Sequence, residues 1–258
     1  MLKSQILKSL LVLAILSQVI FTSAYAQSSS KAGLHHEIVV AEEEDNYIDT
    51  FTADKLATIT PQESLEILME GNKRYLANSK KNRDLAHQRT KTKYNQFPHA
   101  IVLSCMDSRV PLESIFGQGI GDMFSLRVAG NVVSDEIIGS MEYACNLVGT
   151  KLILVVGHSR CGAVTGACDH VSFDKLDTVL ERISPSIDEV RKKNHKGELS
   201  KADFIEEVSK ENVRNVVKQI PQISEELREL IEKGQLAIVG AYYDVATGEV
   251  ILLDKIED

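Results

Sequence analysis

Two short apolar runs, each followed at once by side chains that can do chemistry, constrain the fold of this chain most. Residues 100–103 (Ala-Ile-Val-Leu) and 152–156 (Leu-Ile-Leu-Val-Val) are typical of fully buried parallel strands. In open α/β sheets, ligands bind at the carboxyl ends of the strands. Neighbouring strands lie about 5 Å apart, so they can bring Cys105 and His158 to one metal ion.

A cysteine and histidine set with zinc-ligand spacing follows these runs. Cys105 comes just after the first, and His158 and Cys161 come just after the second, close enough to reach one ion from a single turn. A single buried cysteine or histidine is more often a core residue than a ligand, but this combination predicts a metal site. Three protein ligands leave a fourth tetrahedral position for water, as in catalytic zinc sites.

An aspartate and an arginine accompany the first cysteine. If the first strand stays extended, Cys105, Asp107 and Arg109 share one face by the period-two rule. Asp107 would then lie near the metal, with its carboxylate held ionised by a bidentate pair with Arg109.

The sequence resembles the β-class carbonic anhydrases over about residues 61–253. The resemblance is carried by Cys-Met-Asp-Ser-Arg at 105–109, Arg-Val-Ala-Gly-Asn at 127–131, Glu-Tyr at 142–143 and Gly-His-Ser-Arg-Cys-Gly-Ala at 157–163. It implies one zinc ion per chain, bound by Cys105, His158 and Cys161, with Asp107 and Arg109 as the catalytic dyad. It also implies a substrate pocket near a subunit interface, formed by Gln96, Phe124 and Tyr143.

The implied activity is reversible hydration of carbon dioxide to bicarbonate and a proton. Two thiolates neutralise the formal charge of zinc, so a bound water should titrate on the alkaline side of neutrality. Asp107 would accept a hydrogen bond from the zinc-bound hydroxide and orient it, and Gln96 would donate to an oxygen that gains charge. Hydrolysis of carbon disulfide on the same scaffold is one alternative. A non-catalytic zinc-binding or bicarbonate-binding protein is another, although the intact Asp107-Arg109 pair argues against it.

The pattern of the whole chain predicts an α/β fold with a mainly parallel central sheet flanked by helices, in one catalytic domain over residues 58–258. A capping box with a proline opens a helix over 61–77, and Ser134 is expected to cap another that runs to about Leu147. A strand is expected at 123–128, and helices over much of 175–233 with breaks at Pro185 and Pro221. Residues 236–243 and 250–253 predict a closing hairpin.

The N-terminus has the three-part pattern of a secretory signal. Lys3 and Lys8 precede an apolar stretch over residues 10–21, and Ala24-Tyr25-Ala26 offers a cleavage site, which predicts a signal peptide over 1–26. An uncleaved anchor is the alternative, but the apolar stretch is shorter than a spanning helix needs. We therefore expect no stable membrane insertion and secretion, most simply to a bacterial periplasm. Residues 27–57 predict a polar arm.

Partners and regulation follow from composition and from the resemblance. A formal net charge of −8 argues against nucleic-acid binding, and a pocket near a subunit interface implies a homodimer or a homotetramer.

Cys145 and Cys168 form either a disulfide or, as we favour, two buried free thiols. Some bacterial members of the family hold inhibitory bicarbonate in a second pocket built around a tryptophan. This chain contains no tryptophan, so we expect bicarbonate to act only as product. The glycines at 117, 119 and 121 are expected to be turn residues rather than a phosphate loop.

Overall fold

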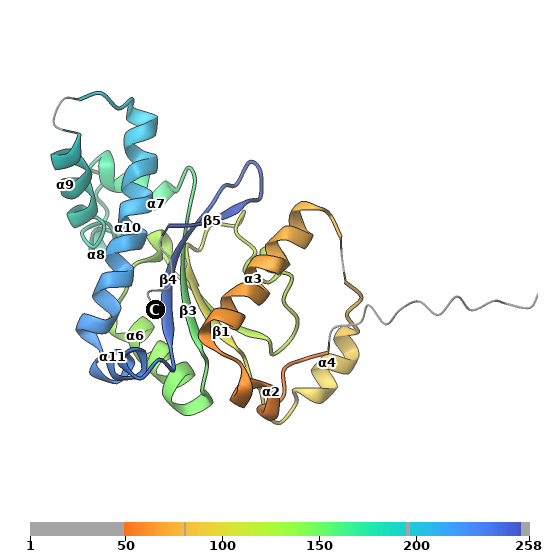
Figure 1. The fold of residues 1–258 in the computed structure, drawn as a ribbon. Helices are drawn as coiled ribbons and strands as arrows, with labels where there is room; N and C mark the ends of the chain where they lie inside the picture. The colour runs from red at the N-terminus through yellow and green to blue at the C-terminus, as the bar shows by residue number, and fades with distance from the viewer. Residues whose placement is uncertain (1–48, 80, 195–196, 254–258) are drawn as a thin grey trace, which may run out of the picture. The chain divides into compact units, whose positions relative to one another are not determined.

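The two apolar runs form adjacent strands in the middle of a sheet, as predicted. The computed structural model describes residues 49–79, 81–194 and 197–253. Within them, β1 (Ala100–Ser104) and β3 (Leu152–His158) are parallel neighbours, and every residue of both strands is buried. The sheet is completed by β2 (Met123–Arg127), β4 (Ala237–Tyr243) and β5 (Val250–Leu252), in the order β2-β1-β3-β4-β5 (Figure 1).

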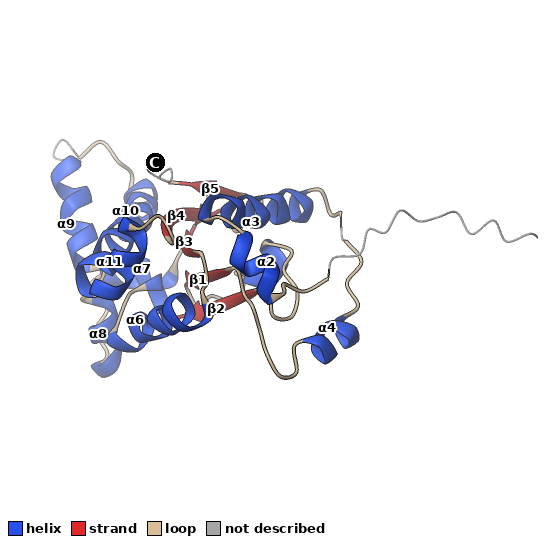
Figure 2. Cartoon of the chain, turned by 60° about the horizontal axis from the view of Figure 1, so that its bottom comes forward, coloured by secondary structure: helices blue, strands red, loops and turns tan. Residues whose placement is uncertain are grey.

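The sheet is mainly parallel, and helices cover both of its faces (Figure 2). Only β5 runs antiparallel, because the short turn after β4 forms a hairpin. One face packs on α3 (Pro61–Leu76) and α5 (Leu112–Ile115), with Val102 and Leu154 in the core. The other face packs on α6 (Asp135–Glu142), α10 (Lys201–Ile223) and α11 (Glu225–Glu232), with Ile101 and Ile153 in the core. Successive strand residues thus enter opposite cores, which explains the unbroken apolar runs.

A third apolar cluster lies at the carboxyl edge of the sheet. It is built on α7 (Gly162–Cys168), α8 (Asp174–Leu180) and α9 (Ser184–Lys193). Cys105 and Cys161 belong to this cluster together with Val164, Ile183 and Val208. The two predicted thiol ligands are therefore held in a dry, packed environment.

The described part of the chain begins ahead of the predicted domain boundary at residue 58. Phe51 and Leu56 are buried, and α2 (Ala53–Thr58) carries Leu56. The Phe51 ring stacks on His99 with 4.6 Å between ring centroids. These residues, which we assigned to the polar arm, pack against the amino edge of the sheet. The predicted signal peptide at 1–26 and the arm up to residue 48 lie outside the described residues.

Both ends of α3 and of α6 test the sequence expectations. Thr60 and Glu63 form the predicted capping box, and the helix ends at Leu76. The prediction for Ser134 was wrong in part: its hydroxyl donates to Glu136 Oε2 (2.7 Å) instead of capping the helix. The α-helix ends at Glu142, and a π-helical turn over Tyr143–Val148 continues it.

The predicted break at Pro221 was also wrong. Pro221 lies inside the last turn of α10, which continues to Ile223. A proline has no backbone N–H, so the last turn of α10 forms without the hydrogen bond that residue 221 would otherwise donate. The chain turns instead at Ser224, whose Oγ accepts from Leu227 N (3.2 Å) and caps α11. Among the described helices, none is long and apolar enough to cross a membrane.

Candidate metal centre

Three donor side chains meet at the carboxyl edge of the sheet. Cys105 directly follows β1, His158 is the last residue of β3, and Cys161 is the N-cap of α7. Their ligand atoms all lie within 4.8 Å of one another, and all three residues are buried. β1 ends at Ser104, opposite Val156, and β3 continues two residues further to His158, so Cys105 and His158 leave the sheet within one residue of the same level. The predicted ligand set is thus brought together by strand pairing and one short turn.

The histidine is arranged as a ligand rather than as a core residue. Its Nδ1 lies 3.0 Å from the carbonyl oxygen of Ser159, which places a proton on Nδ1 and leaves a lone pair on Nε2. Nε2 of His158 is buried and has no hydrogen-bond partner. An unpartnered buried nitrogen costs free energy unless something coordinates it.

The two thiols are polarised by their surroundings. Cys161 Sγ donates to Cys105 Sγ over 3.9 Å, and Gly130 N–H donates to the same sulfur over 3.4 Å. The hydrogen bond from Cys161 is the main reason why the pKa of Cys105 is lowered to about 4. The same contact, together with burial, raises the pKa of Cys161. Two sulfurs and one imidazole nitrogen, buried and facing one another, fit the donor preference of zinc.

The aspartate-arginine pair is formed as predicted. Arg109 donates from Nε to Asp107 Oδ1 (2.9 Å) and from Nη2 to Asp107 Oδ2 (2.8 Å), and its backbone N–H also reaches Oδ1. These hydrogen bonds hold the pKa of Asp107 well below its usual range, so the carboxylate is ionised. Asp107 Oδ2 lies 3.9 Å from His158 Nε2.

The extended strand on which the Asp107 prediction depended does not continue to Arg109. The strand ends at Ser104, and residues 107–110 form a turn with a hydrogen bond from Val110 N to Asp107 O (3.1 Å). The turn begins at Asp107, so the extended run assumed over residues 105–109 stops there, and Arg109 folds back onto the Asp107 carboxylate. Arg127, at the end of β2, stabilises this arrangement by donating to the carbonyl oxygens of Cys105 and Asp107.

Phe124 and Tyr143 lie together but away from Cys105, His158 and Cys161. Their rings meet edge to face, 6.4 Å apart, beside a groove of about 430 Å³ that Glu136 and Gly139 also line. Phe124 pairs with Ile101, four residues before Cys105, which is about 13 Å along the strand. Tyr143 is 52% exposed.

Gln96 lies elsewhere again. It lines a groove of about 340 Å³ with Tyr94, Ile120 and Gly121. A single chain therefore brings together Cys105, His158, Cys161, Asp107 and Arg109, and it does not bring the three predicted pocket residues to them.

Several residues at the site have no counterpart in the sequence predictions. Asn212 Nδ2 donates to Gly130 O (2.9 Å), and Ser209 Oγ donates to His158 O (3.1 Å), both from α10. Gly130 has a φ of 69°, a left-handed conformation that glycine adopts without strain, and this aims its N–H at Cys105. In the sequence, the 127–131 motif was the one indication that Gly130 belongs to the site. Ser209 and Asn212 had none, because their contacts span 51 and 82 residues of sequence.

The other cysteines agree with the sequence reasoning in part, and the glycines agree with it. Cys145 and Cys168 are both free thiols, as favoured, but only Cys145 is buried, whereas Cys168 is partly exposed. Burial raises the pKa of Cys145 to about 12, which keeps it protonated. Gly117 and Gly121 have positive φ values and lie in the turn before β2, so they are turn glycines.

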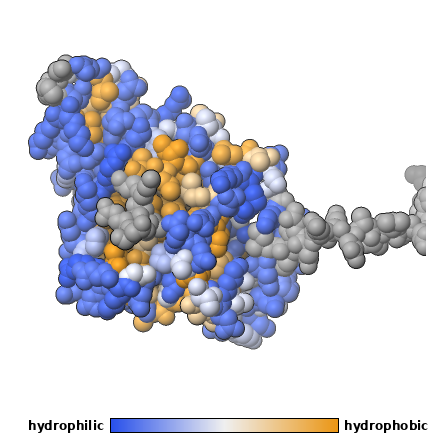
Figure 3. Space-filling model, viewed as in Figure 1, coloured by the Kyte–Doolittle hydropathy of each residue, from blue (hydrophilic) through white to orange (hydrophobic). Residues whose placement is uncertain are grey.

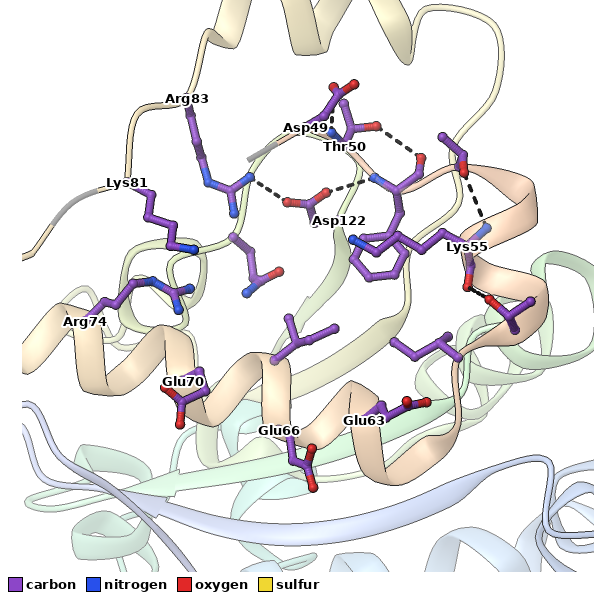
Figure 4. A pocket seen from close by; sticks show the side chains of 16 residues that line it. Asp49, Thr50, Lys55, Glu63, Glu66, Glu70, Arg74, Lys81, Arg83 and Asp122 are labelled. Carbon is purple, nitrogen blue, oxygen red and sulfur yellow. Dashed lines mark hydrogen bonds and ion pairs between the residues drawn. The ribbon is translucent and has the colours of Figure 1, made fainter. Parts of the chain in front are cut away.

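A larger cavity lies at the opposite edge of the sheet, beside α2 and α3 (Figure 4). Its volume is about 870 Å³. Its buried Asp122 carboxylate accepts from Arg83 Nη1 (2.8 Å), Gly119 N (2.8 Å) and Phe51 N (3.3 Å). Within the described ranges, the sole cysteine, histidine and carboxylate cluster with metal-ligand geometry is the one at residues 105, 158 and 161. The buried carboxylate of the larger cavity is thus fully hydrogen-bonded by the protein.

A mainly parallel α/β sheet with a buried Cys-His-Cys set at its carboxyl edge is typical of a metal-binding α/β protein. Comparison with known proteins identifies the family. The family profile described as "Carbonic anhydrase" matches residues 100–250. Carbonic anhydrase 2 of Mycobacterium tuberculosis is 35% identical over 202 residues, which cover 76% of this chain and 94% of that protein. The carbonic anhydrase of Mycolicibacterium smegmatis is 33% identical over 204 residues, 77% of this chain and 96% of that protein.

Solved structures agree on the fold. A β-carbonic anhydrase of Aspergillus fumigatus superposes with a TM-score of 0.60 at 25% identity, covering 75% of this chain and 92% of that one. A carbon disulfide hydrolase of Acidithiobacillus thiooxidans is also similar, 35% identical over 100 residues, which cover 35% of this chain and 46% of that protein. The chain belongs to the β-class carbonic anhydrases and is an enzyme of that family.

Proposed function

We propose that this enzyme catalyses the zinc-dependent, reversible hydration of carbon dioxide to bicarbonate and a proton. The observation that carries the proposal is the geometry at the carboxyl edge. Three buried donor atoms lie within 4.8 Å of one another, and an ionised carboxylate stands 3.9 Å from the unpartnered His158 nitrogen. Cys105, His158 and Cys161 would hold one zinc ion. When bound there, zinc would lower the pKa of a water molecule and so supply a nucleophile.

Asp107 and Arg109 orient the attacking water in this proposal. The Asp107 carboxylate accepts hydrogen bonds from Arg109 and keeps lone-pair capacity for one more donor. Because its pKa is held low, it acts as an acceptor throughout the neutral range and does not compete as an acid. A hydrogen bond from the water O–H to Asp107 would turn an oxygen lone pair toward carbon dioxide.

A second copy of the chain is part of the proposal. Tyr143 and its neighbour Leu147 are 52% and 76% exposed, and Phe124 lies on the edge strand β2. Aromatic side chains that are exposed in one chain and expected in a substrate pocket favour a pocket completed by a partner. A second apolar surface lies between α3 and α10 (Figure 3), where β5 exposes Ile251 and Leu252. One such interface gives a dimer, and two give a tetramer.

Light scattering tests the assembly. Tyr143→Asp should release monomers that hydrate carbon dioxide at least tenfold more slowly, because the pocket loses its wall. Leu252→Asp is the matched variant at the other surface, and it should give active dimers. A fully active monomer at assay concentration would refute the shared pocket.

Carbon disulfide hydrolysis is the second candidate, because of the similarity over 100 residues to a carbon disulfide hydrolase. The carbonic anhydrases match over twice that length. A stopped-flow hydration assay and a sulfide-release assay on the same zinc-analysed sample decide between them. We expect hydration with about one zinc per chain. Sulfide release without hydration would replace our proposal, and bound zinc with neither reaction would favour a binding protein.

We also propose export from the cytoplasm to the bacterial periplasm, supported by the signal pattern over residues 1–26. Expression with the native N-terminus in a Gram-negative host should yield periplasmic protein that begins at Gln27. Leu13→Arg, which interrupts the apolar stretch, is the control and should retain the uncleaved chain in the cytosol. An uncleaved N-terminus in the membrane fraction would support the anchor instead.

A further inference from the structure

Helix α10 holds the loops of the metal centre through three side chains that are three residues apart. Glu206 accepts a hydrogen bond from the backbone N–H of Arg160. Ser209 donates to the carbonyl oxygen of His158, and Asn212 donates to that of Gly130. Figure 1 shows α10 running alongside the sheet. The helix can approach closely because position 157 is a glycine. A Cβ there would lie 2.6 Å from Val213 Cγ2.

Ser209 and Asn212 are buried, but Glu206 is half-buried and contacts the loop between two metal ligands. Its Oε1 accepts from the backbone N–H of Arg160 over 2.9 Å. Arg160 has a φ of 55°, which is the left-handed region and is unfavourable for a residue with a side chain. A backbone in that conformation persists where hydrogen bonds hold it, and Glu206 supplies one.

The carbonyl group of Arg160 contacts the Asp107-Arg109 pair. The carbonyl oxygen of Arg160 accepts from Arg109 Nη2 over 3.2 Å. The same Nη2 donates to Asp107 Oδ2 over 2.8 Å. A continuous set of hydrogen bonds therefore runs from Glu206 through residue 160 and Arg109 to Asp107. Arg109 is about half exposed, so packing alone does not fix its guanidinium.

We propose that Glu206 is a positioning residue for the reaction. Its carboxylate fixes the backbone at Arg160, whose carbonyl oxygen orients the Arg109 guanidinium on Asp107. Glu206 itself touches neither substrate nor the reacting atoms. The kinetic part of this inference rests on the proposed hydration activity, whereas the placement of Arg109 does not.

Side chains of matched length separate the hydrogen bond from the charge. Glu206→Gln keeps an acceptor oxygen and removes the charge, and Glu206→Met has a similar length with neither. Glu207→Gln is the control, because Glu207 is the next residue along α10 and pairs with Lys210 away from the loop. We expect Glu206→Met to lower kcat/KM for hydration about tenfold with zinc content unchanged. Glu206→Gln and Glu207→Gln should stay within about twofold of wild type.

A spectroscopic readout makes the test independent of activity. The Arg109 side-chain Nε–Hε resonance, assigned with Arg109→Lys, should exchange slowly with water in the wild type and in Glu206→Gln. It should exchange fast in Glu206→Met. Melting temperatures identify any variant that is merely unfolded. If Glu206→Met is unfolded, Glu206→Ala, which also removes the acceptor oxygen, takes its place and should show the same loss of kcat/KM and fast Arg109 exchange.

Three results would overturn the inference. The first is a Glu206→Met variant with the kcat/KM and the Arg109 exchange rate of the wild type. The second is a Glu206→Gln variant whose kcat/KM falls as far as that of Glu206→Met. The third is a loss of kcat/KM in Glu207→Gln that equals the loss in Glu206→Met. If the wild type hydrates no carbon dioxide, the proposed function fails, and the Arg109 exchange rates still decide the positioning role.

Discussion

His99 and His158 are both buried, yet they lie at opposite edges of the sheet and serve opposite purposes. His99 precedes β1, and both of its ring nitrogens have partners: Ser64 Oγ at 2.8 Å from Nδ1 and Gln118 Oε1 at 3.2 Å from Nε2. His158 ends β3, and its Nε2 has none. The difference shows that burial does not identify a ligand. What identifies one is a buried lone pair that no protein group satisfies.

The charge states of the side chains around His99 and around His158 also differ. Burial lowers the pKa of His99 to about 4, so its ring is neutral and structural. At the carboxyl edge, hydrogen bonds hold the pKa of Asp107 well below its usual range and that of Cys105 at about 4. The His99 ring is thus neutral beside the Arg83–Asp122 ion pair, whereas the carboxyl edge gathers negative charge where a cation would bind.

Removing a donor from each edge tests the comparison most strongly. Cys105→Ala and His158→Ala should lose zinc and at least about 1,000-fold in hydration rate, because the nucleophile depends on the metal. His99→Ala should keep its zinc and lose about 3 kcal/mol of stability through a cavity and unpaired partners. Metal analysis, stopped-flow assays and urea unfolding measure these effects. Full activity in a metal-free Cys105→Ala protein would refute the assignment.

A substitution at the dyad is expected to have a smaller effect. Asp107→Asn keeps the size of the side chain but removes its charge and one acceptor for Arg109. We expect zinc to be retained and kcat/KM to fall about 100-fold. Ser108→Ala, at the exposed neighbouring position, is the control and should leave kcat/KM unchanged. Equal rates in both variants would remove Asp107 from the mechanism.

The pH dependence of stability tests the amino edge. His99 has a pKa of about 4 in the folded state and about 6.5 when unfolded, so the unfolded chain binds more protons between these values. The contribution is fully present above pH 6.5 and is lost as the pH falls toward 4. The loss between pH 7.5 and 5 is about 2 kcal/mol. Urea unfolding at both values measures it, with His99→Gln as the control that removes this difference. An unchanged pH difference in His99→Gln would show that other groups titrate.

Bicarbonate binding is expected to show the smallest change. The chain has no tryptophan, so a second bicarbonate pocket built on an indole cannot form, and product should bind only at the carboxyl edge. Inhibition by bicarbonate near neutral pH should then give a Hill coefficient of about one. A coefficient clearly above one, or bicarbonate away from the metal in soaked crystals, would show that another residue has replaced the tryptophan.

Where sequence reasoning failed, the determining contacts were distant along the chain. Gln118, which satisfies His99, is 19 residues away, and Ser64 is 35 residues away. No local pattern indicates either contact. The turn after β1 shows the same limit at short range. The apolar run predicts where a strand lies, but the hydrogen bond from Arg127 to the carbonyl oxygen of Asp107 helps to decide where extended structure stops.

The sequence by itself determined the central strands, the Cys-His-Cys cluster and the Asp107-Arg109 pair, because apolar periodicity and donor spacing are local properties of the chain. Only the tertiary structure decided what holds them in place. Strand order sets Cys105 beside His158, and α10 places Glu206, Ser209 and Asn212 against loops that are 46 to 82 residues away. It also separated Phe124 and Tyr143 from the Cys-His-Cys cluster, because the register of β2 on β1 puts Phe124, whose ring contacts Tyr143, about 13 Å back from the edge. Register and helix docking are set by packing over the whole core, which no short stretch of sequence encodes.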